Sequence, residues 1–495
     1  MIVDTDIVRL ALSAQTDAGR KAHFGQFLTP SPVAHFMASL FRPGPYKECR
    51  LLDPGAGIGT LSAAFLNRCI SKDLNFQRIT VDAFEIDERL EPHLIRTLGA
   101  CREHLSYEST VRSRDFIESA VAALAGDLFA DLLPRYTHAI LNPPYKKMRS
   151  DSPHRSDLRR VGIETVNLYS AFVALALELL EDGGQLVAII PRSFCNGPYY
   201  RPFRDFILGR AALRQIHLFH ARNKAFRDDN VLQENIIIGL ERGARQDSVT
   251  VTVSTDDSFN DLASHVYPFS GIVFPNDSER FIHVPTAASD TPAAQTSTLT
   301  ATLADLGISV STGPIVDFRL RQHLLQTPEA GAVPLLYPGH FSGERLEWPK
   351  KDFRKPNAIS INSETERWLY PKGFYTVVRR FSSKEEKRRI VASVVDPAVF
   401  PEAEWLGFEN HLNVFHSQRH GLTEDVAHGL AAFLNTRALD TYFRSFNGHT
   451  QVNATDLRQL RYPSHLLLAR LGNWSKKHPQ ATPEKVDEKV KAVTA

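Results

Sequence analysis

Short apolar runs that alternate with helical segments between residues 50 and 240 constrain the fold of this chain most strongly. The run Gln185–Pro191 is almost entirely apolar, as is typical of a central strand buried on both faces of a parallel sheet. One helix is expected to have Ser31 as its N-cap and Pro32 as its first residue, and another to span Leu168–Glu181 and to be closed by Asp182-Gly183-Gly184. This alternation predicts a doubly wound α/β domain.

The strand expected at His138–Leu141 ends in the corner Asn142-Pro143-Pro144-Tyr145. Consecutive prolines fix φ and favour an extended conformation for the residue before them, so Asn142 is held in place. The side-chain oxygen of Asn142 and the carbonyl oxygen of Pro143 can then point at one place, beside a flat ring. This geometry suits a planar heterocycle with an amino group. For these four residues alone, a proline turn capped by asparagine is an equally good interpretation.

Three further groups follow expected strands. Asp53-Pro54-Gly55-Ala56-Gly57-Ile58-Gly59 is a strand-to-helix turn whose glycines let a ligand approach the backbone, and it matches neither the dinucleotide nor the phosphate-loop pattern. Glu85 ends the next strand, where a carboxylate can accept both hydroxyl groups of a ribose. Asp115-Phe116 ends the third and could bond an adenine amino group and cover its ring. Any one of these acids is more often an ordinary loop residue, but together they predict a single nucleotide-like site.

The order and spacing of these motifs resemble the S-adenosylmethionine-dependent DNA adenine-N6 methyltransferases that place the catalytic domain first and the target-recognition domain last. Gly25–Pro30 resembles the N-terminal motif of that family, Asp53–Gly59 its cofactor loop and Asn142–Tyr145 its catalytic tetrapeptide. The resemblance covers residues 20–240 by motif. It implies a Rossmann-like sheet, S-adenosyl-L-methionine as the cofactor and double-stranded DNA as the substrate, usually within a restriction–modification system.

In that family the target adenine is flipped out of the duplex to reach the tetrapeptide. Hydrogen bonds to Asn142 and Pro143 would localise the amino lone pair, so catalysis would rest on positioning and electrostatics. Tyr145 would stack on one face of the base and Phe226 on the other. The residues expected to bind the cofactor are Thr29, Pro30, Asp53, Gly55, Gly57, Glu85, Asp115, Phe116 and Asn142.

Leu168, Tyr169 and Phe172 match an apolar motif of the family beside the cofactor adenine, although they equally suit the buried face of a helix.

Charge predicts where DNA would bind. Lys and Arg number 32 against 36 Asp and Glu in residues 1–306, and 26 against 20 in residues 307–495. An anionic partner is therefore expected for the C-terminal half. The cations that follow the tetrapeptide are either simply solvated or contact phosphate. The candidates for DNA-backbone contact are Lys146, Lys147, Arg149, Lys350, Lys351 and Arg354.

Four parts are expected along the chain. They are a catalytic domain at 1–245, a connecting segment with some β structure at 246–305, a mixed α+β target-recognition domain at 306–470 and a charged flexible tail at 471–495. Within the third part, Ser311-Thr312-Gly313 opens the domain, a helix is expected at Glu424–Leu434, and Phe446-Asn447-Gly448 precedes Gln451-Val452-Asn453. Base-edge contacts are expected from loop residues that the sequence does not identify.

The four cysteines show no CxxC spacing, which favours a reducing compartment and argues against a structural metal. The N-terminus lacks the apolar core of a signal peptide, and no stretch approaches the length of a membrane span. We therefore expect a cytoplasmic bacterial or archaeal protein without a membrane partner. No nuclease signature is evident, so any cognate restriction endonuclease would be a separate protein.

Two other functions stay open at this point. Asn-Pro-Pro-Tyr is shared with enzymes that methylate guanine in RNA or glutamine in proteins, although those enzymes generally lack so long a C-terminal domain. The alternative from another class is a non-catalytic DNA-binding subunit that retains the methyltransferase fold. The intact Asp53 loop, Glu85 and Asn142 argue against that second alternative.

Overall fold

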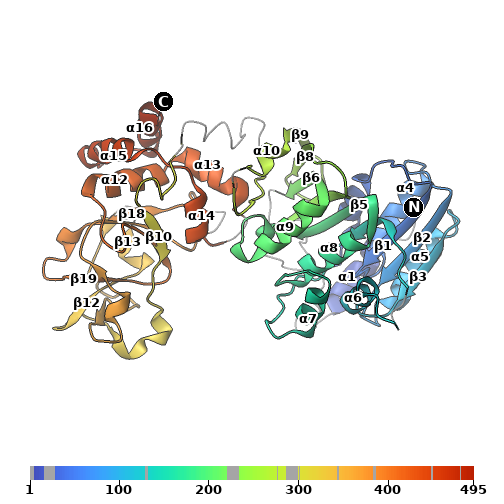
Figure 1. Cartoon of the computed structure of the whole chain (residues 1–495), viewed down its shortest axis with the longest axis horizontal. Coiled ribbons are helices and arrows are strands. Elements are labelled where there is room, and N and C mark those ends of the chain that lie inside the picture. The colour runs from blue at the N-terminus through green and yellow to red at the C-terminus, as the bar shows by residue number, and fades with distance from the viewer. Residues whose placement is uncertain are drawn as a thin grey trace. The chain divides into compact units, whose positions relative to one another are not determined.

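The computed structural model describes residues 5–15, 28–128, 132–219, 234–275, 277–285, 299, 301–342, 345–382, 386–447, 450–479 and 481–494. The chain forms two compact units, unit 1 (Met1–Ala288) and unit 2 (Ser289–Ala495). Figure 1 labels their helices and strands.

A nine-stranded sheet in the order β3-β2-β1-β4-β5-β7-β6-β8-β9 organises unit 1 (Figure 1). The first five strands are parallel, and β7 runs antiparallel between β5 and β6. The strands are β1 (Glu48–Pro54), β2 (Arg78–Phe84), β3 (Glu108–Arg112), β4 (Tyr136–Leu141), β5 (Leu180–Pro191), β6 (Ala211–Phe219), β7 (Asn235–Arg242), β8 (Ser248–Ser254) and β9 (Ala263–Pro268). The helices are α1 (Thr5–Gln15), α3 (Ser31–Ser39), α4 (Thr60–Ile70), α5 (Glu91–Cys101), α6 (Phe116–Ala125), α7 (Pro153–Arg160), α8 (Leu168–Leu179), α9 (Arg201–Arg210) and α10 (Phe269–Ile272).

Successive side chains of the central strands enter two separate cores, because side chains alternate between the faces of a strand. In β1, Leu51 packs with α3, α4 and α5, whereas Leu52 packs with α6 and α8. In β5, Ile189 enters the first core and Ile190 the second. Helices therefore cover both faces of the sheet, and the predicted doubly wound α/β fold is confirmed.

The segment expected to connect two domains belongs to this sheet, which is a correction to the predicted boundary at residue 245. β8 pairs parallel with β6, and β9 pairs antiparallel with β8. Alternating valines and threonines explain the placement, since Val249, Val251 and Val253 point into the core while the threonines do not.

Two expected helix ends differ from the structure. Helix α3 begins at Ser31 with Pro30 as its N-cap, so Ser31 is the first helical residue and not the cap. Helix α8 ends at Leu179, and Asp182-Gly183-Gly184 lies inside β5. Gly183 has a φ of +84° where the register between β4 and β5 shifts, as in a β-bulge that glycine permits.

Unit 2 is a mixed α+β unit with a four-stranded sheet, β10-β20-β17-β18, and a five-stranded sheet, β11-β15-β12-β19-β16. Side chains of both sheets share one core, which includes Leu336, Val377, Phe408 and Val414. The strands are β10 (Ser309–Thr312), β11 (Leu324–Leu325), β12 (Ala332–Leu336), β13 (Phe341–Ser342), β14 (Arg345–Leu346), β15 (Ala358–Ser360), β16 (Tyr370–Pro371), β17 (Tyr375–Arg379), β18 (Ala392–Val395), β19 (Trp405–Phe408) and β20 (Leu412–His416). The helices are α12 (Glu424–Leu434), α13 (Arg437–Phe446), α14 (Ala454–Gln459), α15 (His465–Lys477) and α16 (Pro483–Thr494). The helix predicted at Glu424–Leu434 is confirmed.

The predicted flexible tail from residue 471 is wrong for its first part, because that boundary falls inside α15. Helix α15 crosses α12 with backbones in close approach: a Cβ atom on Gly429 would collide with the carbonyl oxygen of Leu468, and one on Gly472 with that of Asp425. Lys476 also pairs with Glu424 at 3.0 Å.

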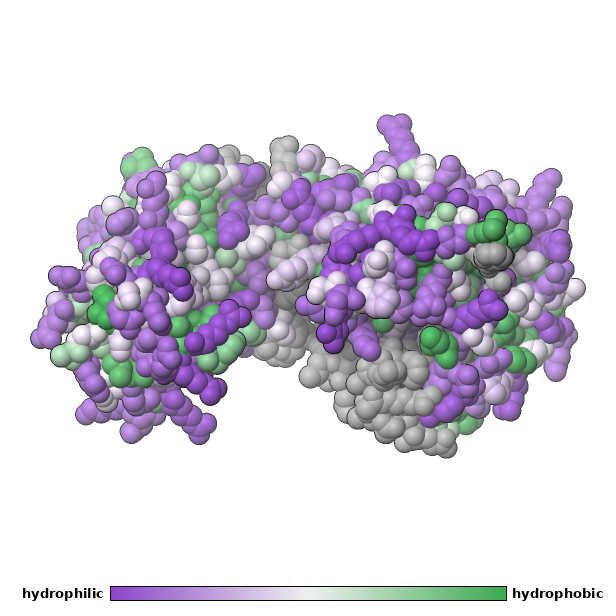
Figure 2. All heavy atoms as spheres, turned by 60° about the horizontal axis from the view of Figure 1, so that its bottom comes forward, coloured by the Kyte–Doolittle hydropathy of each residue, from purple (hydrophilic) through white to green (hydrophobic). Residues whose placement is uncertain are grey.

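Figure 2 shows hydrophilic side chains over most of the visible face, with hydrophobic atoms in scattered groups. Within the described part of the chain, no helix has the length and apolar character needed to cross a membrane.

Candidate active site

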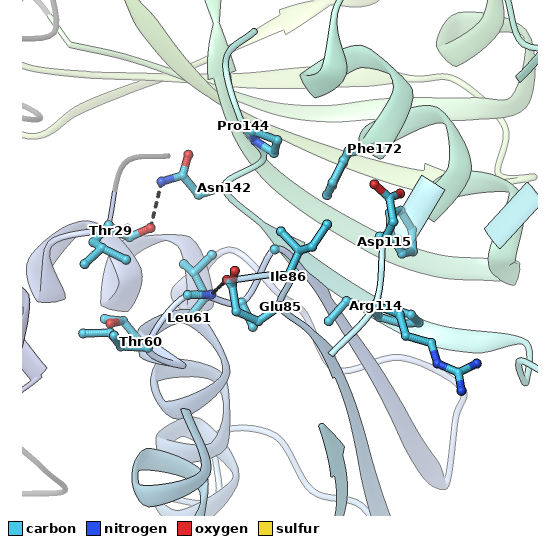
Figure 3. A pocket seen from close by; sticks show the side chains of 17 residues that line it. Thr29, Thr60, Leu61, Glu85, Ile86, Arg114, Asp115, Asn142, Pro144 and Phe172 are labelled. Atoms are coloured by element: carbon cyan, nitrogen blue, oxygen red, sulfur yellow. Dashed lines mark hydrogen bonds between the residues drawn. The ribbon is translucent and has the colours of Figure 1, made fainter. Parts of the chain in front are cut away.

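A cavity at the carboxyl ends of β1, β2 and β4 collects most of the predicted cofactor residues (Figure 3). It encloses about 750 Å³ of space, including its open mouth. The predicted residues that line it are Thr29, Gly55, Gly57, Glu85, Asp115, Phe116 and Asn142, together with Pro144 of the tetrapeptide.

The glycine turn after β1 forms one wall from bare backbone. Gly57 has a φ of +59°, and a Cβ atom there would lie 3.0 Å from Leu28 Cδ2, which lines the same cavity. Gly59, with a φ of +85°, is the N-cap of α4, and a Cβ atom would lie 2.9 Å from Leu94 Cδ1. The turn therefore requires glycine both for its left-handed conformation and for space.

Glu85 follows β2 and closes this turn from the other side. Its Oε2 accepts a hydrogen bond from the Gly57 backbone N–H at 2.8 Å, and its Oε1 accepts one from the Asp87 N–H at 2.7 Å. Burial raises the pKa of Glu85, and the backbone hydrogen bonds work against that rise. Since each carboxylate oxygen has a second lone pair, Glu85 can fix the turn and still accept two hydroxyl groups of a ligand.

Asp53, in contrast, does not line the cavity. It is fully buried, and its Oδ2 accepts a hydrogen bond from the Ser62 hydroxyl at 2.6 Å at the start of α4. Its Oδ1 has no hydrogen-bond partner among the described residues. Burial, with a smaller contribution from Glu85, raises the pKa of Asp53 to about 7. Asp53 thus lies behind the glycine turn. It stabilises the turn through Ser62 and does not face the cavity.

Asp115 has a second role that the sequence interpretation did not include. The third strand ends at Arg112, and Asp115 is the N-cap of α6, where its Oδ1 accepts from the backbone N–H groups of Ile117 and Glu118 at 2.7 and 3.1 Å. Its Oδ2 lies 3.2 Å from His154 Nε2 of α7. The capping pattern of Asp115 followed three residues later by Glu118 was the available sequence signal.

The contact with His154 links the cavity to α7, the helix that follows the cations after the tetrapeptide. The hydrogen bond to Asp115 raises the pKa of His154. Burial acts to raise the pKa of Asp115, but the hydrogen bond from His154 and the capping bonds outweigh it and hold that pKa below its ordinary value. Figure 3 shows the Asp115 carboxylate beside Phe172, while the guanidinium of Arg114 points away from Glu85 and Asn142.

The Asn142 side chain is held from both sides at the end of β4. Its Nδ2 donates to the Thr29 hydroxyl at 3.0 Å (Figure 3), and its Oδ1 accepts from the Tyr145 hydroxyl at 2.9 Å. The same Tyr145 hydroxyl lies 3.1 Å from the carbonyl oxygen of Ile189 in β5. The corner is therefore an ordered amide that borders the cavity, as its two prolines predicted.

Aromatic rings form another part of the cavity wall, next to Gly55. The ring centroids of Phe116 and Phe172 are 5.1 Å apart, and those of Phe84 and Phe116 are 5.2 Å apart. Phe172 lines the cavity, whereas Tyr169 is buried and meets Tyr145 edge to face with centroids 6.3 Å apart. Ile86, absent from the sequence interpretation, also lines the cavity and is 52% exposed. Its position directly after Glu85, the acid expected to bind a ribose, was the only sequence signal for it.

Several predicted residues lie elsewhere. Pro30, Pro143 and Tyr145 do not line the cavity, although Tyr145 bonds to Asn142. Phe226 lies outside the described residues, so the second stacking position is not described. The candidates for backbone contact are exposed in both units, except that Lys350 is half-buried: Lys146, Lys147 and Arg149 in unit 1, and Lys350, Lys351 and Arg354 in unit 2.

The site is thus a cavity of a doubly wound sheet at which the glycine turn, Glu85 and the Asn-Pro-Pro-Tyr corner meet. The family model described as "Eco57I restriction-modification methylase" matches residues 134–226, which include the corner. A solved DrdV–DNA complex aligns over 96% of this chain and 60% of its own, with a TM-score of 0.51 and 12% identity, and supports the fold alone.

Relatives in sequence extend over nearly the whole chain. The Type II methyltransferase M.BsuBI of Bacillus subtilis is 52% identical over 92% of this chain and 90% of its own. The Type II methyltransferase M.PstI of Providencia stuartii is 42% identical over 94% and 92%. The chain belongs to the Type II methyltransferases of restriction–modification systems.

Proposed function

We propose that this chain transfers the methyl group of S-adenosyl-L-methionine to the N6 amino group of an adenine flipped out of double-stranded DNA. The observation that carries the proposal is the position of Asn142. Its carboxamide borders the same cavity as the glycine turn and Glu85, so an acceptor for an amino group and a site for a nucleoside cofactor are adjacent.

The residues around the cavity fit that cofactor. Glu85 would accept the ribose hydroxyls, and the bare backbone at Gly55 and Gly57 would let the nucleoside approach. Phe116 and Phe172 offer apolar ring surface for an adenine, with the Asp115 carboxylate beside them. When bound, the cofactor supplies the electrophilic methyl group.

The amino nitrogen of adenine is a weak nucleophile because its lone pair is delocalised into the ring. A hydrogen bond from this amino group to Asn142 Oδ1, and one to the Pro143 carbonyl oxygen, would localise that lone pair and aim it at the methyl group. The Tyr145 hydroxyl has one proton for two acceptors. When it donates to Ile189, it no longer donates to Asn142 Oδ1, which can then accept from the substrate.

Tyr145 is a hydrogen-bond donor and ring platform in this proposal, and it is not a general base. Burial raises the pKa of its hydroxyl well above the ordinary range. Catalysis then rests on orientation, with the proton lost after methyl transfer going to water.

Transfer of labelled methyl groups from S-adenosyl-L-methionine to duplex DNA, RNA and protein tests the substrate. We expect label in DNA, and on the N6 atom of adenine. Label only in RNA or protein would favour the other enzymes that share the tetrapeptide. Asn142→Ala should abolish transfer to DNA. Unchanged transfer in that variant would refute the role of Asn142.

The setting follows from family membership. A modification enzyme of a restriction–modification system protects cytoplasmic DNA, and a separate cognate endonuclease would cut the unmodified sites. Mapping of methylated adenines in a host genome that expresses this chain would identify the recognition sequence. Sequence-specific binding without methylation would instead favour the non-catalytic DNA-binding subunit.

A further inference from the structure

One edge of the four-stranded sheet in unit 2 gathers sequence motifs that the catalytic site does not use. β10 and β17 end at this edge, at Thr312 and Arg379, and β20 begins there at Leu412. We call the loops at this edge the loop edge. It consists of Gly313, residues 380–382, residues 410–411 and residues 451–452.

Backbone hydrogen bonds join the segments of the loop edge. The Arg380 N–H donates to the His411 carbonyl oxygen at 2.8 Å, and the Val452 N–H donates to the Arg380 carbonyl oxygen at 2.7 Å. The Asn413 side chain of β20 donates to the Val452 carbonyl oxygen at 2.7 Å. Gly313 packs so tightly on this corner that a Cβ atom would collide with the carbonyl oxygen of Glu409.

A buried network of polar side chains also connects these segments. Arg389 is fully buried and donates to Asn447 Oδ1 at 2.8 Å and to Ser382 Oγ at 3.1 Å. Asn447 in turn donates to Asp456 Oδ2 at 3.1 Å, and Asp456 also accepts from the Asn453 backbone N–H at 2.9 Å. Buried polar groups are costly unless they are paired, and when paired they hold one rigid arrangement. The network therefore gives the loop edge a defined shape.

Flat side chains cover the outside of this rigid base. Phe381 is 42% exposed, and the His411 side chain is 45% exposed, with ring centroids 5.1 Å apart. The buried carboxylate of Glu409 accepts from His411 Nδ1 at 2.5 Å and from the His411 backbone N–H at 2.9 Å, so the imidazole is oriented. An exposed phenylalanine on a fixed loop, paired with an oriented imidazole, suits stacking on a planar partner.

The charges at the loop edge favour an anionic partner. Arg380 is part of the edge and donates to the Asn410 carbonyl oxygen at 3.2 Å, beside the Gln451 side chain at 3.4 Å. Two acids nearby are each paired with a cation, Asp317 with Lys355 and Glu386 with Arg379, while the Glu409 carboxylate is buried.

We propose that the loop edge docks on duplex DNA, with Phe381 and His411 stacking against an exposed base or base step and Arg380 contacting the phosphate backbone. The inference rests on the proposed function, since it takes the substrate to be DNA. It assigns stacking and phosphate contacts to individual residues of unit 2. Each phosphate contact adds to the slope of log affinity against log salt, whereas aromatic stacking changes the affinity and not that slope. The two parts of the proposal can therefore be tested separately.

Equilibrium binding to a fluorescent duplex that contains the methylation site tests the proposal, with the site taken from genome mapping. Phe381→Ala should weaken binding about tenfold or more, because base–aromatic stacking is lost, and the salt dependence should stay that of the wild type. Arg380→Gln should reduce the slope of log affinity against log salt by about 1, as expected for one lost phosphate contact.

Matched controls lie on α15 of the same unit. Leu466 is 60% exposed and Arg470 is exposed one turn further, so Leu466→Ala and Arg470→Gln remove an exposed apolar side chain and an exposed cation from another surface. Both should bind DNA like the wild type. Cofactor affinity, measured by calorimetry with S-adenosyl-L-homocysteine, and the far-ultraviolet spectrum should be unchanged in all four variants.

The outcomes separate the two proposals. If the wild type transfers no methyl group to DNA, the proposed function fails. If the wild type methylates DNA, but Phe381→Ala and Arg380→Gln bind as tightly and with the same salt slope as the α15 controls, the loop edge is not the docking surface. Phe381→Trp, which keeps a flat ring, should retain most of the affinity, and loss equal to that of Phe381→Ala would refute the stacking role.

Discussion

The buried carboxyl of Asp53 makes the stability of unit 1 depend on pH. Its pKa is raised from 3.8 to about 7, chiefly by burial. A group whose folded-state pKa is raised stabilises the fold fully below its unfolded pKa and loses that contribution as pH rises through the folded value. The difference of about three pH units corresponds to about 4 kcal/mol, lost between pH 4 and pH 7.

Asp53→Asn removes this dependence because the amide is neutral at every pH. The side-chain oxygen of the variant would keep the hydrogen bond from Ser62, and its amino group would occupy the position of Oδ1, which has no partner among the described residues. That second feature costs a constant amount. The readout is therefore the slope: the stability of the variant relative to the wild type should rise between pH 4 and pH 7 and level off above.

Urea unfolding across this pH range can follow the two units separately. All four tryptophans, Trp348, Trp368, Trp405 and Trp474, lie in unit 2, so their fluorescence reports unit 2 and serves as an internal reference. Hydrogen exchange of peptides from β1 and α4 reports unit 1. Asp73→Asn, at a carboxyl whose side chain is 56% exposed, is the control. Parallel pH profiles for the wild type and Asp53→Asn would refute the reasoning.

Four other changes test the site and the fold. Glu85→Gln leaves one oxygen where two backbone N–H groups converge, so cofactor affinity should fall about tenfold to a hundredfold in calorimetry. Gly57→Ala places a Cβ atom against Leu28 at a φ of +59° and should cost about 1–2 kcal/mol of stability in urea unfolding and weaken cofactor binding. The pKa of His154 is raised from 6.5, first by Asp115 and then by Glu118 and Asp157, so its ion pair with Asp115 is lost as pH rises through that raised pKa. The protection factors of the α7 amides, which correct for the intrinsic pH dependence of exchange, should then fall in the wild type but not in His154→Gln. Gly429→Ala should lower the midpoint of the tryptophan-detected transition, because its Cβ atom would collide with the backbone of α15.

Local signals were sufficient for the parts of the site that depend on backbone geometry. Two prolines after Asn142 predicted a held amide, and the glycine turn predicted bare backbone, because φ and space are fixed by those residue types alone. The acid after β2 was also found, since a carboxylate at a strand end is visible in sequence order.

Other features depended on tertiary contacts that no local pattern contains. Asp53 and Glu85 look alike as acids after strands, yet one is buried behind the turn and the other faces the cavity. The partner of Asp115 on α7 lies 39 positions further along the chain, so sequence could not pair it with His154. The valine alternation of β8 indicated a strand but not which sheet it joins.

The crossing of α12 and α15 has a consequence for the other end of unit 2. Helix α12 lies against β17, where the Thr376 hydroxyl donates to the Ala427 carbonyl oxygen at 2.8 Å, and β17 leads directly into Arg380 and Phe381. A chain that ends before Gly472 would therefore lose the part of α15 that packs on α12. Since α12 lies against β17, the support of β17 would be weakened. Shortened proteins of this kind should bind DNA poorly even though every residue of the loop edge is present, and the C-terminus is a poor place for trimming or for a rigid fusion.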